Sequence, residues 1–262
     1  MNKIGVWETY PEDGPLVAAA IHDGEGLRPE AAELIAVDKK TRKLEEDPFT
    51  SDLADLGITR IIGLRSRFEV DLNRPREKAV YINPEDAWGI NIWKTPPQPA
   101  FIARSLEAYD SFYNEMHRIF SGLESRFGHF AVLDIHSYNY RREGPDGPPA
   151  DPTENPEVNI GTGTINRQIW GPLVDRFMND LRRFQHKGCP LDVRENIKFR
   201  GGNFSRWIHE NFPRSGCSIS VEFKKIFMDE WTGIPDHKVM EQLRTALRTT
   251  LTGLSEELAK LK

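Results

Sequence analysis

His22 and Glu25 stand three residues apart at the end of a short apolar run, a spacing that suits a metal-binding site. The run, residues 17–21, reads Val-Ala-Ala-Ala-Ile and is bounded by polar residues, which is typical of a buried strand. Gly24 lies between the two side chains and permits a tight turn, because glycine tolerates backbone angles that other residues resist. His22 and Glu25 therefore could supply two metal ligands, and the alternative is an exposed turn with a solvated Glu25.

His136 is a third candidate ligand and follows another apolar run much later in the chain. Residues 130–135 read Phe-Ala-Val-Leu-Asp-Ile and predict a second buried strand that ends at His136. Two parallel strands that each deliver a histidine at the carboxyl end would place both imidazoles in the crevice where open α/β sheets bind ligands. Catalytic zinc sites commonly use three protein ligands, such as two His and one Glu, and leave a fourth position for water. We therefore expect His22, Glu25 and His136 to bind one Zn²⁺ per chain, brought together only by the fold.

Glu222 is the candidate general base. It lies between Val221 and Phe223 in a third predicted strand, residues 217–225. A carboxylate inside an apolar strand is costly unless it is paired or has a function. A partly desolvated carboxylate has a raised pKa, so it could accept and return a proton near neutral pH. We expect Glu222 to act on the zinc-activated water.

Four arginines lie within residues 65–76, directly after a predicted strand at residues 58–64. Arg67 suits stabilisation of a developing oxyanion. The planar guanidinium of Arg74, with Asn73 beside it, matches a substrate carboxylate in a bidentate way. The alternative is a surface lattice of salt bridges with neighbouring acids, and Arg76 is the arginine that we expect to lie outside the site.

The apolar patterns predict an α/β protein, and the chain has no stretch that resembles a linker, so we expect a single domain, residues 1–262. Strands are predicted where β-branched and apolar residues run together, and helices where apolar residues recur every three or four positions. The predicted strands are residues 17–21, 58–64, 130–135, 197–202 and 217–225, the predicted helices are residues 29–46, 50–56, 100–127, 165–184, 203–211 and 238–261, and the Pro-rich segments 81–99 and 141–156 are predicted loops.

The composition excludes several classes of partner. Hydrophobic residues make up 38% and charged residues 29%, as in ordinary globular proteins. The formal net charge of -5 and the lack of a basic run argue against nucleic-acid binding. No apolar run approaches the roughly 18 residues needed to span a bilayer, so we expect a cytoplasmic protein with no membrane partner. Cys189 and Cys217 are expected to be reduced, because a chain of this size needs no disulfide. The oligomeric state stays open.

Several segments resemble, in order, the motifs of the N-formylglutamate amidohydrolase (N-formylglutamate deformylase) family. The resemblance extends from about His22 to Glu230, which is nearly the whole chain. Its most specific part is the arginine-rich stretch, and its glycine motifs are weak taken alone. The segments are Ser66–Pro75, Leu133–Ser137, Asn159–Thr162, Phe199–Gly202, Val221–Phe223 and Met228–Glu230.

The resemblance implies a three-layer α/β/α fold around a central mixed, mostly parallel sheet. Such a fold is similar to that of zinc carboxypeptidases and of the succinylglutamate desuccinylase and aspartoacylase group. It also implies zinc-dependent hydrolysis of an amide bond. By position in the motifs, it assigns metal ligation to His22 and His136, acid/base catalysis to Glu222, and carbonyl and carboxylate recognition to Arg67, Asn73 and Arg74.

The leading hypothesis is a zinc-dependent amidohydrolase that cleaves a small acidic N-acyl amino acid, for example N-formyl-L-glutamate to L-glutamate and formate. One alternative is a carboxypeptidase-like zinc peptidase, which should accept peptides longer than an acylated amino acid. A second alternative is a non-catalytic binder of acidic metabolites, which would carry no stoichiometric metal.

Overall fold

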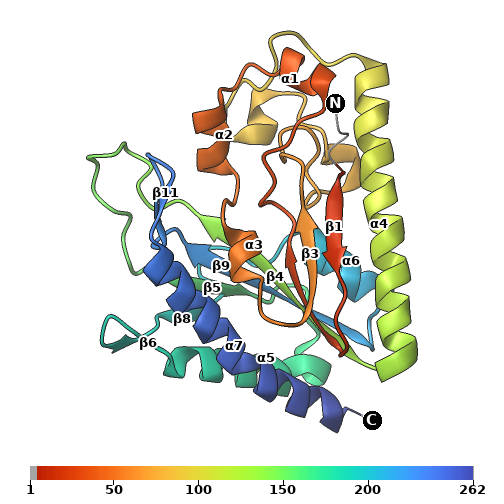
Figure 1. The fold of residues 1–262 in the computed structure, drawn as a ribbon, viewed down its shortest axis with the longest axis vertical. Coiled ribbons are helices and arrows are strands. Elements are labelled where there is room, and N and C mark those ends of the chain that lie inside the picture. The colour runs from red at the N-terminus through yellow and green to blue at the C-terminus, as the bar shows by residue number, and fades with distance from the viewer. Residues whose placement is uncertain (1–4, 262) are drawn as a thin grey trace.

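The computed structural model describes residues 5–261 and is built around a seven-stranded mixed sheet. The strand order is β1-β3-β2-β4-β9-β5-β8 (Figure 1). The central strands β3, β2, β4 and β9 run parallel to one another, β1 and β5 are antiparallel to β3 and β9, and β8 is parallel to β5. The bounds are β1 (Trp7–Tyr10), β2 (Leu16–Ala20), β3 (Thr59–Gly63), β4 (Phe130–Tyr138), β5 (Val158–Gly161), β8 (Val193–Glu195) and β9 (Gly216–Lys224).

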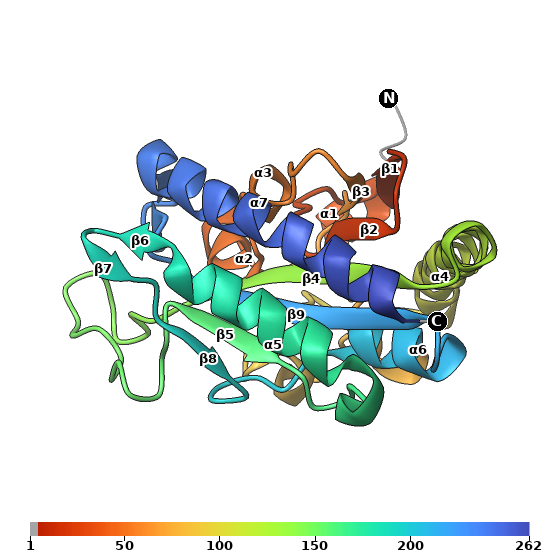
Figure 2. The same ribbon diagram turned by 90° about the horizontal axis from the view of Figure 1, so that it is seen from below.

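Helices cover both faces of the sheet, which explains the continuous apolar run of β2. Ala18 and Ala20 pack into one core with α5 and α7, whereas Val17 and Ala19 pack into a second core with α4 and α6. The helices α5 and α7 lie side by side over the sheet in Figure 2. Successive strand residues point to opposite faces, so a strand that is buried on both sides needs apolar residues throughout. This confirms the three-layer α/β/α prediction. The helices are α1 (Pro29–Leu34), α2 (Lys39–Glu45), α3 (Thr50–Leu53), α4 (Pro99–Phe127), α5 (Arg167–Arg183), α6 (Asn203–Asn211) and α7 (His237–Lys260).

The longest helix, α4, follows the predicted periodicity closely. Phe112, Met116 and Phe120 recur four residues apart and are fully buried against the sheet. Pro99 occupies the first helical turn, where its missing N–H costs no intrahelical bond. Gly128 ends the helix with a φ of 75°, a conformation that glycine adopts at little cost.

Several predicted elements differ from the structure. The predicted strand at residues 130–135 continues to Tyr138, so His136 lies within β4, and the predicted helix at residues 50–56 ends at Leu53. The predicted helix at residues 29–46 is divided into α1 and α2, because Ile35 and Asp38 have extended backbone angles and Asp38 caps α2 by accepting a hydrogen bond from the Thr41 N–H. The predicted strand at residues 197–202 is irregular. The side chain of Asn159 binds the N–H of Lys198 and the carbonyl of Phe199, so a side chain satisfies this backbone instead of a neighbouring strand.

The remaining elements are short. Cys189 is exposed, Cys217 is buried, and both are free. Within residues 5–261, no helix combines the length and the apolar character needed to cross a membrane. The short elements are the 3₁₀ helices η1 (Arg76–Lys78) and η2 (Pro84–Ala87), the pair β6 (Gln185–His186) and β7 (Cys189–Pro190), and the pair β10 (Met228–Asp229) and β11 (Ile234–Pro235).

Candidate active site

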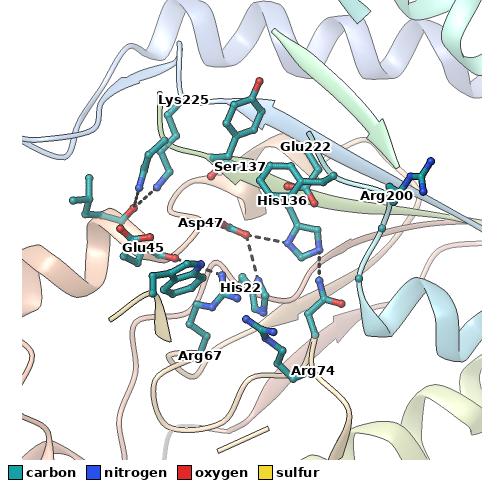
Figure 3. A pocket seen from close by; sticks show the side chains of 18 of the residues that line it. His22, Glu45, Asp47, Arg67, Arg74, His136, Ser137, Arg200, Glu222 and Lys225 are labelled. Atoms are coloured by element: carbon teal, nitrogen blue, oxygen red, sulfur yellow. Dashed lines mark hydrogen bonds and ion pairs between the residues drawn. The ribbon is translucent and has the colours of Figure 1, made fainter. Parts of the chain in front are cut away.

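A cavity of about 310 Å³ lies at the carboxyl ends of the parallel strands β2, β4 and β9 (Figure 3). This is the edge at which open α/β sheets bind ligands. The fold thus brings together side chains that are far apart in the sequence. The predicted site residues that line the cavity are His22, Arg67, Asn73, Arg74, His136 and Glu222.

Three buried side chains at the base of the cavity form a candidate metal centre. Nδ1 of His136 lies 2.9 Å from Oδ2 of Asp47, and Nδ1 of His22 lies 3.4 Å from the same oxygen. The three potential ligand atoms lie within 4.8 Å of one another, and no other such group of three is present among residues 5–261. Two imidazoles and one carboxylate are a donor set that suits a divalent metal such as zinc.

Each imidazole is oriented by a second buried carboxylate. Nε2 of His22 lies 2.7 Å from Oδ1 of Asp71, and Nε2 of His136 lies 2.9 Å from Oδ1 of Asp134. A carboxylate at Nε2 holds a ring proton there, and the Nδ1 atom faces Asp47 at the centre of the cluster. The Nδ1 proton makes the hydrogen bond to Asp47, and a bound metal would take the place of that proton. The cluster therefore suits a metal ion both in the type of its ligand atoms and in the orientation of its two imidazole rings.

The charges in the cluster act strongly on one another. Burial by itself raises the pKa of Asp47, but hydrogen bonds from His136 and His22 outweigh it and leave the pKa well below its usual range. Burial lowers the pKa of His136, and the charge of Asp134 together with the hydrogen bonds to Asp134 and Asp47 raises it well above its ordinary value. The ionised carboxylate of Asp47 therefore attracts positive charge to the cluster, whether as protons or as a metal ion.

Glu25 is not part of this cluster, which corrects the predicted ligand set. Its side chain is 53% exposed and its Oε1 lies 3.0 Å from Nζ of Lys39. Residues 24–26 run alongside residues 64–66, with Gly26 N–H donating to the Leu64 carbonyl. A Cβ at Gly24 would overlap the Leu64 backbone, so this glycine permits close approach of two chain segments and Glu25 is left facing solvent.

Asp47 occupies the position that Glu25 was expected to fill, and the sequence analysis missed it. It lies in the connection between α2 and α3, and its N–H donates to the carbonyl of His22. No apolar run precedes it. The only local signal is an acidic stretch, Glu45-Glu46-Asp47 before Pro48, and such a stretch is usually a solvated surface.

Glu222 lies beside the candidate metal centre, as predicted from its place in an apolar strand. It is the register partner of His136 across β4 and β9, so the two side chains leave the same face of the sheet. Burial raises the pKa of Glu222 to about 7. A carboxyl group with this pKa can both accept and donate a proton near neutral pH.

Arg67 is held firmly at the cavity wall. Its Nη2 donates to Oδ2 of Asp71 at 2.8 Å, its Nε donates to the Tyr81 hydroxyl at 3.2 Å, and its guanidinium lies 5.0 Å from the ring centre of Trp88. Burial alone would lower the pKa of Arg67, but the charge of Asp71 outweighs burial and raises it. Arg67 therefore presents a fixed, permanent positive charge to the cavity.

Arg74 and Asn73 line the same wall and differ in how they are held. The Arg74 side chain is 39% exposed, and its Nε lies 3.8 Å from Asp71. Asn73 is anchored, because its Oδ1 accepts the Phe204 N–H and its own N–H donates to Oδ1 of Asp71 at 2.7 Å. Arg76 lies outside the cavity and pairs with Asp110 on α4, as expected.

The cavity wall also contains cations that the sequence analysis did not assign to the site. Lys225 is buried at the end of β9, and burial lowers its pKa to about 8. Arg142 comes from the Pro-rich loop and donates to both carboxylate oxygens of Glu45, at 2.9 and 3.3 Å. Arg200 lies at the far side of the cavity in Figure 3. The wall is therefore rich in positive charge, and its lining also includes the aromatic residues Trp88, Tyr138 and Phe199.

Comparison with solved structures shows the same fold in two bacterial proteins. N-formylglutamate amidohydrolase from Ralstonia eutropha JMP134 aligns with a TM-score of 0.75 at 18% identity, covering 98% of this chain and 99% of that one. The gene product Atu2144 from Agrobacterium tumefaciens aligns with a TM-score of 0.62 at 15% identity, covering 95% and 96%. No curated protein matches the sequence significantly.

The family-level comparison agrees with the structural one. A family model described as N-formylglutamate amidohydrolase matches residues 14–227 of the sequence. The match includes the cluster of His22, Asp47 and His136 and also Glu222. The chain therefore belongs to the N-formylglutamate amidohydrolase family.

Proposed function

We propose that this protein is a zinc-dependent amidohydrolase that cleaves the amide bond of a small acidic N-acyl amino acid, with N-formyl-L-glutamate as the first substrate to test. The proposal rests on one observation. The buried cluster of His22, Asp47 and His136 shares a cavity with several arginines and with the carboxyl group of Glu222, whose pKa is raised to about 7. Family membership supports the hydrolase class.

The roles of the residues follow from their chemistry. His22, Asp47 and His136 would hold the metal, which when bound lowers the pKa of a water ligand and polarises the scissile carbonyl. Glu222 accepts the proton of the attacking water and delivers a proton to the nitrogen of the leaving amine. One water is consumed, the C–N bond breaks, and the products are a carboxylic acid and an amino acid.

The arginines bind and stabilise negative charge. Arg67 is fixed by Asp71 and Tyr81, so it donates to the developing oxyanion without having to reorganise. Arg74 is more exposed and offers its guanidinium to the substrate carboxylate, with Asn73 beside it. Arg142 and Arg200 add positive charge at the cavity wall, which favours an acidic substrate. The cytoplasmic location and the small-molecule partner remain predictions from the sequence.

The test combines metal analysis with substrate profiling. Purified protein should contain one zinc per chain, lose activity on chelation and regain it when zinc is added. It should release formate from N-formyl-L-glutamate faster than it hydrolyses the acetyl and succinyl analogues or longer peptides. A preference for peptides would favour a peptidase, and a protein without stoichiometric metal would be a binder. The proposal is wrong if His136→Ala retains both metal and turnover.

A further inference from the structure

Asp47 differs from the other two members of the candidate metal centre because no regular element carries it. His136 lies within β4 and His22 directly follows β2, whereas α2 ends at Glu45 and α3 begins at Thr50. A ligand must be held to within about 0.5 Å of its productive position, which is harder to achieve on a loop than on a strand. Contacts from outside this loop must therefore hold Asp47 in place, and the bond from its N–H to the His22 carbonyl leaves the Glu46 side of the loop to be held by other groups.

Lys225 makes contacts that do this. Its Nζ donates to the Leu44 carbonyl at 2.6 Å and to the Glu46 carbonyl at 2.9 Å. The Glu46 carbonyl belongs to the planar peptide group that joins Glu46 to Asp47. A hydrogen bond at that oxygen therefore fixes the orientation of the peptide from which the Asp47 side chain departs.

The burial of Lys225 indicates that these contacts are specific. The residue is 1% exposed, and its hydrogen-bond partners among residues 5–261 are main-chain carbonyls. A buried ammonium group carries a large desolvation cost, which good hydrogen bonds offset in part. An apolar residue at this point of β9 would avoid the cost and would leave the two carbonyls without their charged donor.

A second side chain supports the same segment from a neighbouring strand. Asn139, directly after β4, donates through Nδ2 to the Leu44 carbonyl at 2.8 Å. β4 also carries His136, and β9 carries Glu222 three residues before Lys225. The two strands thus fix one imidazole and the candidate base directly, and they fix the Asp47 segment through Asn139 and Lys225.

We propose that Lys225 is a positioning residue that holds the Glu46–Asp47 peptide so that the Asp47 carboxylate reaches the imidazoles of His22 and His136. This inference rests on the proposed metal centre. It assigns Lys225 no contact with the reacting atoms. The Lys225 ammonium affects the metal centre through the position of Asp47, so the experiments measure zinc affinity with Asp47 present and with Asp47 removed.

The first experiment measures zinc affinity of the metal-free protein by competition with a chromophoric chelator. Lys225→Met keeps the length of the side chain and removes every donor. We expect it to weaken zinc binding by about 10- to 100-fold, the usual effect of losing a group that orients a ligand. The matched control is Lys224→Met, because Lys224 Nζ also donates to a backbone carbonyl, that of Asn155, but does not line the cavity. Its zinc affinity should match that of wild type.

The second experiment separates positioning from a general structural role. In an Asp47→Ala background, Lys225→Met should cause no further loss of zinc affinity, because the residue through which it acts is already absent. If both backgrounds lose affinity equally, or if Lys225→Met lowers only the melting temperature, the inference is wrong. Lys225→Gln, which retains an amide donor, provides the same comparison if the Met variant does not fold, and its affinity should be intermediate. Failure of wild-type protein to bind zinc would instead overturn the proposed function.

Discussion

His136 on β4 and Glu222 on β9 are register partners in adjacent parallel strands. Their side chains leave the same face of the sheet, so the distance between a candidate metal ligand and the candidate base is set by the strand pairing. Burial at this position raises the pKa of Glu222 to about 7. Strand pairing in the interior of the sheet therefore determines the spacing on which proton transfer depends.

Replacing Glu222 should separate catalysis from metal binding. Glu222→Gln keeps the size of the side chain and removes its ability to carry a proton, so we expect kcat for amide hydrolysis to fall by about 10²- to 10⁴-fold. Zinc content should stay at the wild-type value, because Glu222 is not one of the three clustered ligands. Steady-state kinetics and metal analysis of the same preparation test this, and a variant with wild-type kcat would exclude Glu222 as the base.

Asp47 and Glu25 should behave oppositely when each is replaced by alanine. Asp47→Ala removes one of three clustered donors and should lower zinc affinity by at least about tenfold. Glu25→Ala removes an exposed partner of Lys39 and should leave zinc affinity unchanged. Zinc retained after dialysis against a chelator distinguishes the two. If Glu25→Ala loses the metal and Asp47→Ala keeps it, the ligand set predicted from the sequence is correct after all.

Arg74 should contribute to substrate binding more than to the chemical step. Arg74→Ala removes a charge-assisted hydrogen bond to the substrate carboxylate, worth about 1.5 to 3 kcal/mol, so KM for N-formyl-L-glutamate should rise about 10- to 100-fold with little change in kcat. Arg76→Ala is the control, because Arg76 lies in the same stretch but pairs with Asp110 outside the cavity. Equal effects of the two variants would show that Arg74 has no special role in binding.

The histidines of the candidate site could be found from the sequence because local patterns mark them. In the sequence, His22 and His136 each come directly after an apolar run. Such a run predicts a buried strand without knowledge of the rest of the fold. Parallel strands then place their carboxyl ends at one edge of the sheet. Glu222 is marked in a similar way, as a charge within an apolar strand.

Asp47 could not be found in this way because tertiary contacts determine its position. Lys225 holds its segment from 179 residues away in the sequence, and Asp47 N–H binds the carbonyl of His22. Neither contact leaves a pattern in the residues around position 47. The irregular backbone at residues 198–199 is similar, because the side chain of Asn159 from a distant strand satisfies it. The secondary-structure propensities of neighbouring residues do not reveal hydrogen bonds between residues that are far apart in the sequence.

His209 on α6 should make stability depend on pH independently of the metal centre. Its Nε2 accepts the Ser218 N–H at 2.9 Å, so its ring proton lies on Nδ1, which donates to the Thr164 hydroxyl at 2.8 Å. Burial lowers the pKa of His209 from 6.5 to about 4. Between pH 6.5 and pH 4, His209 is therefore protonated in the unfolded chain but stays neutral in the folded protein. Stability is lost as the pH falls from 6.5 towards 4, by at most about 3 kcal/mol from this group.

Urea unfolding of metal-free protein at several pH values between 7 and 4 tests this. His209→Gln removes the titrating ring, so its free energy of unfolding should lie furthest below that of wild type near pH 7. The difference should shrink steadily as the pH is lowered, because only wild type loses the His209 contribution. His117→Gln, at an exposed position on α4, provides the effect of replacing a surface histidine. A constant difference between wild type and His209→Gln across this range would mean that His209 titrates alike in the folded and unfolded chains, so that burial does not keep the ring neutral.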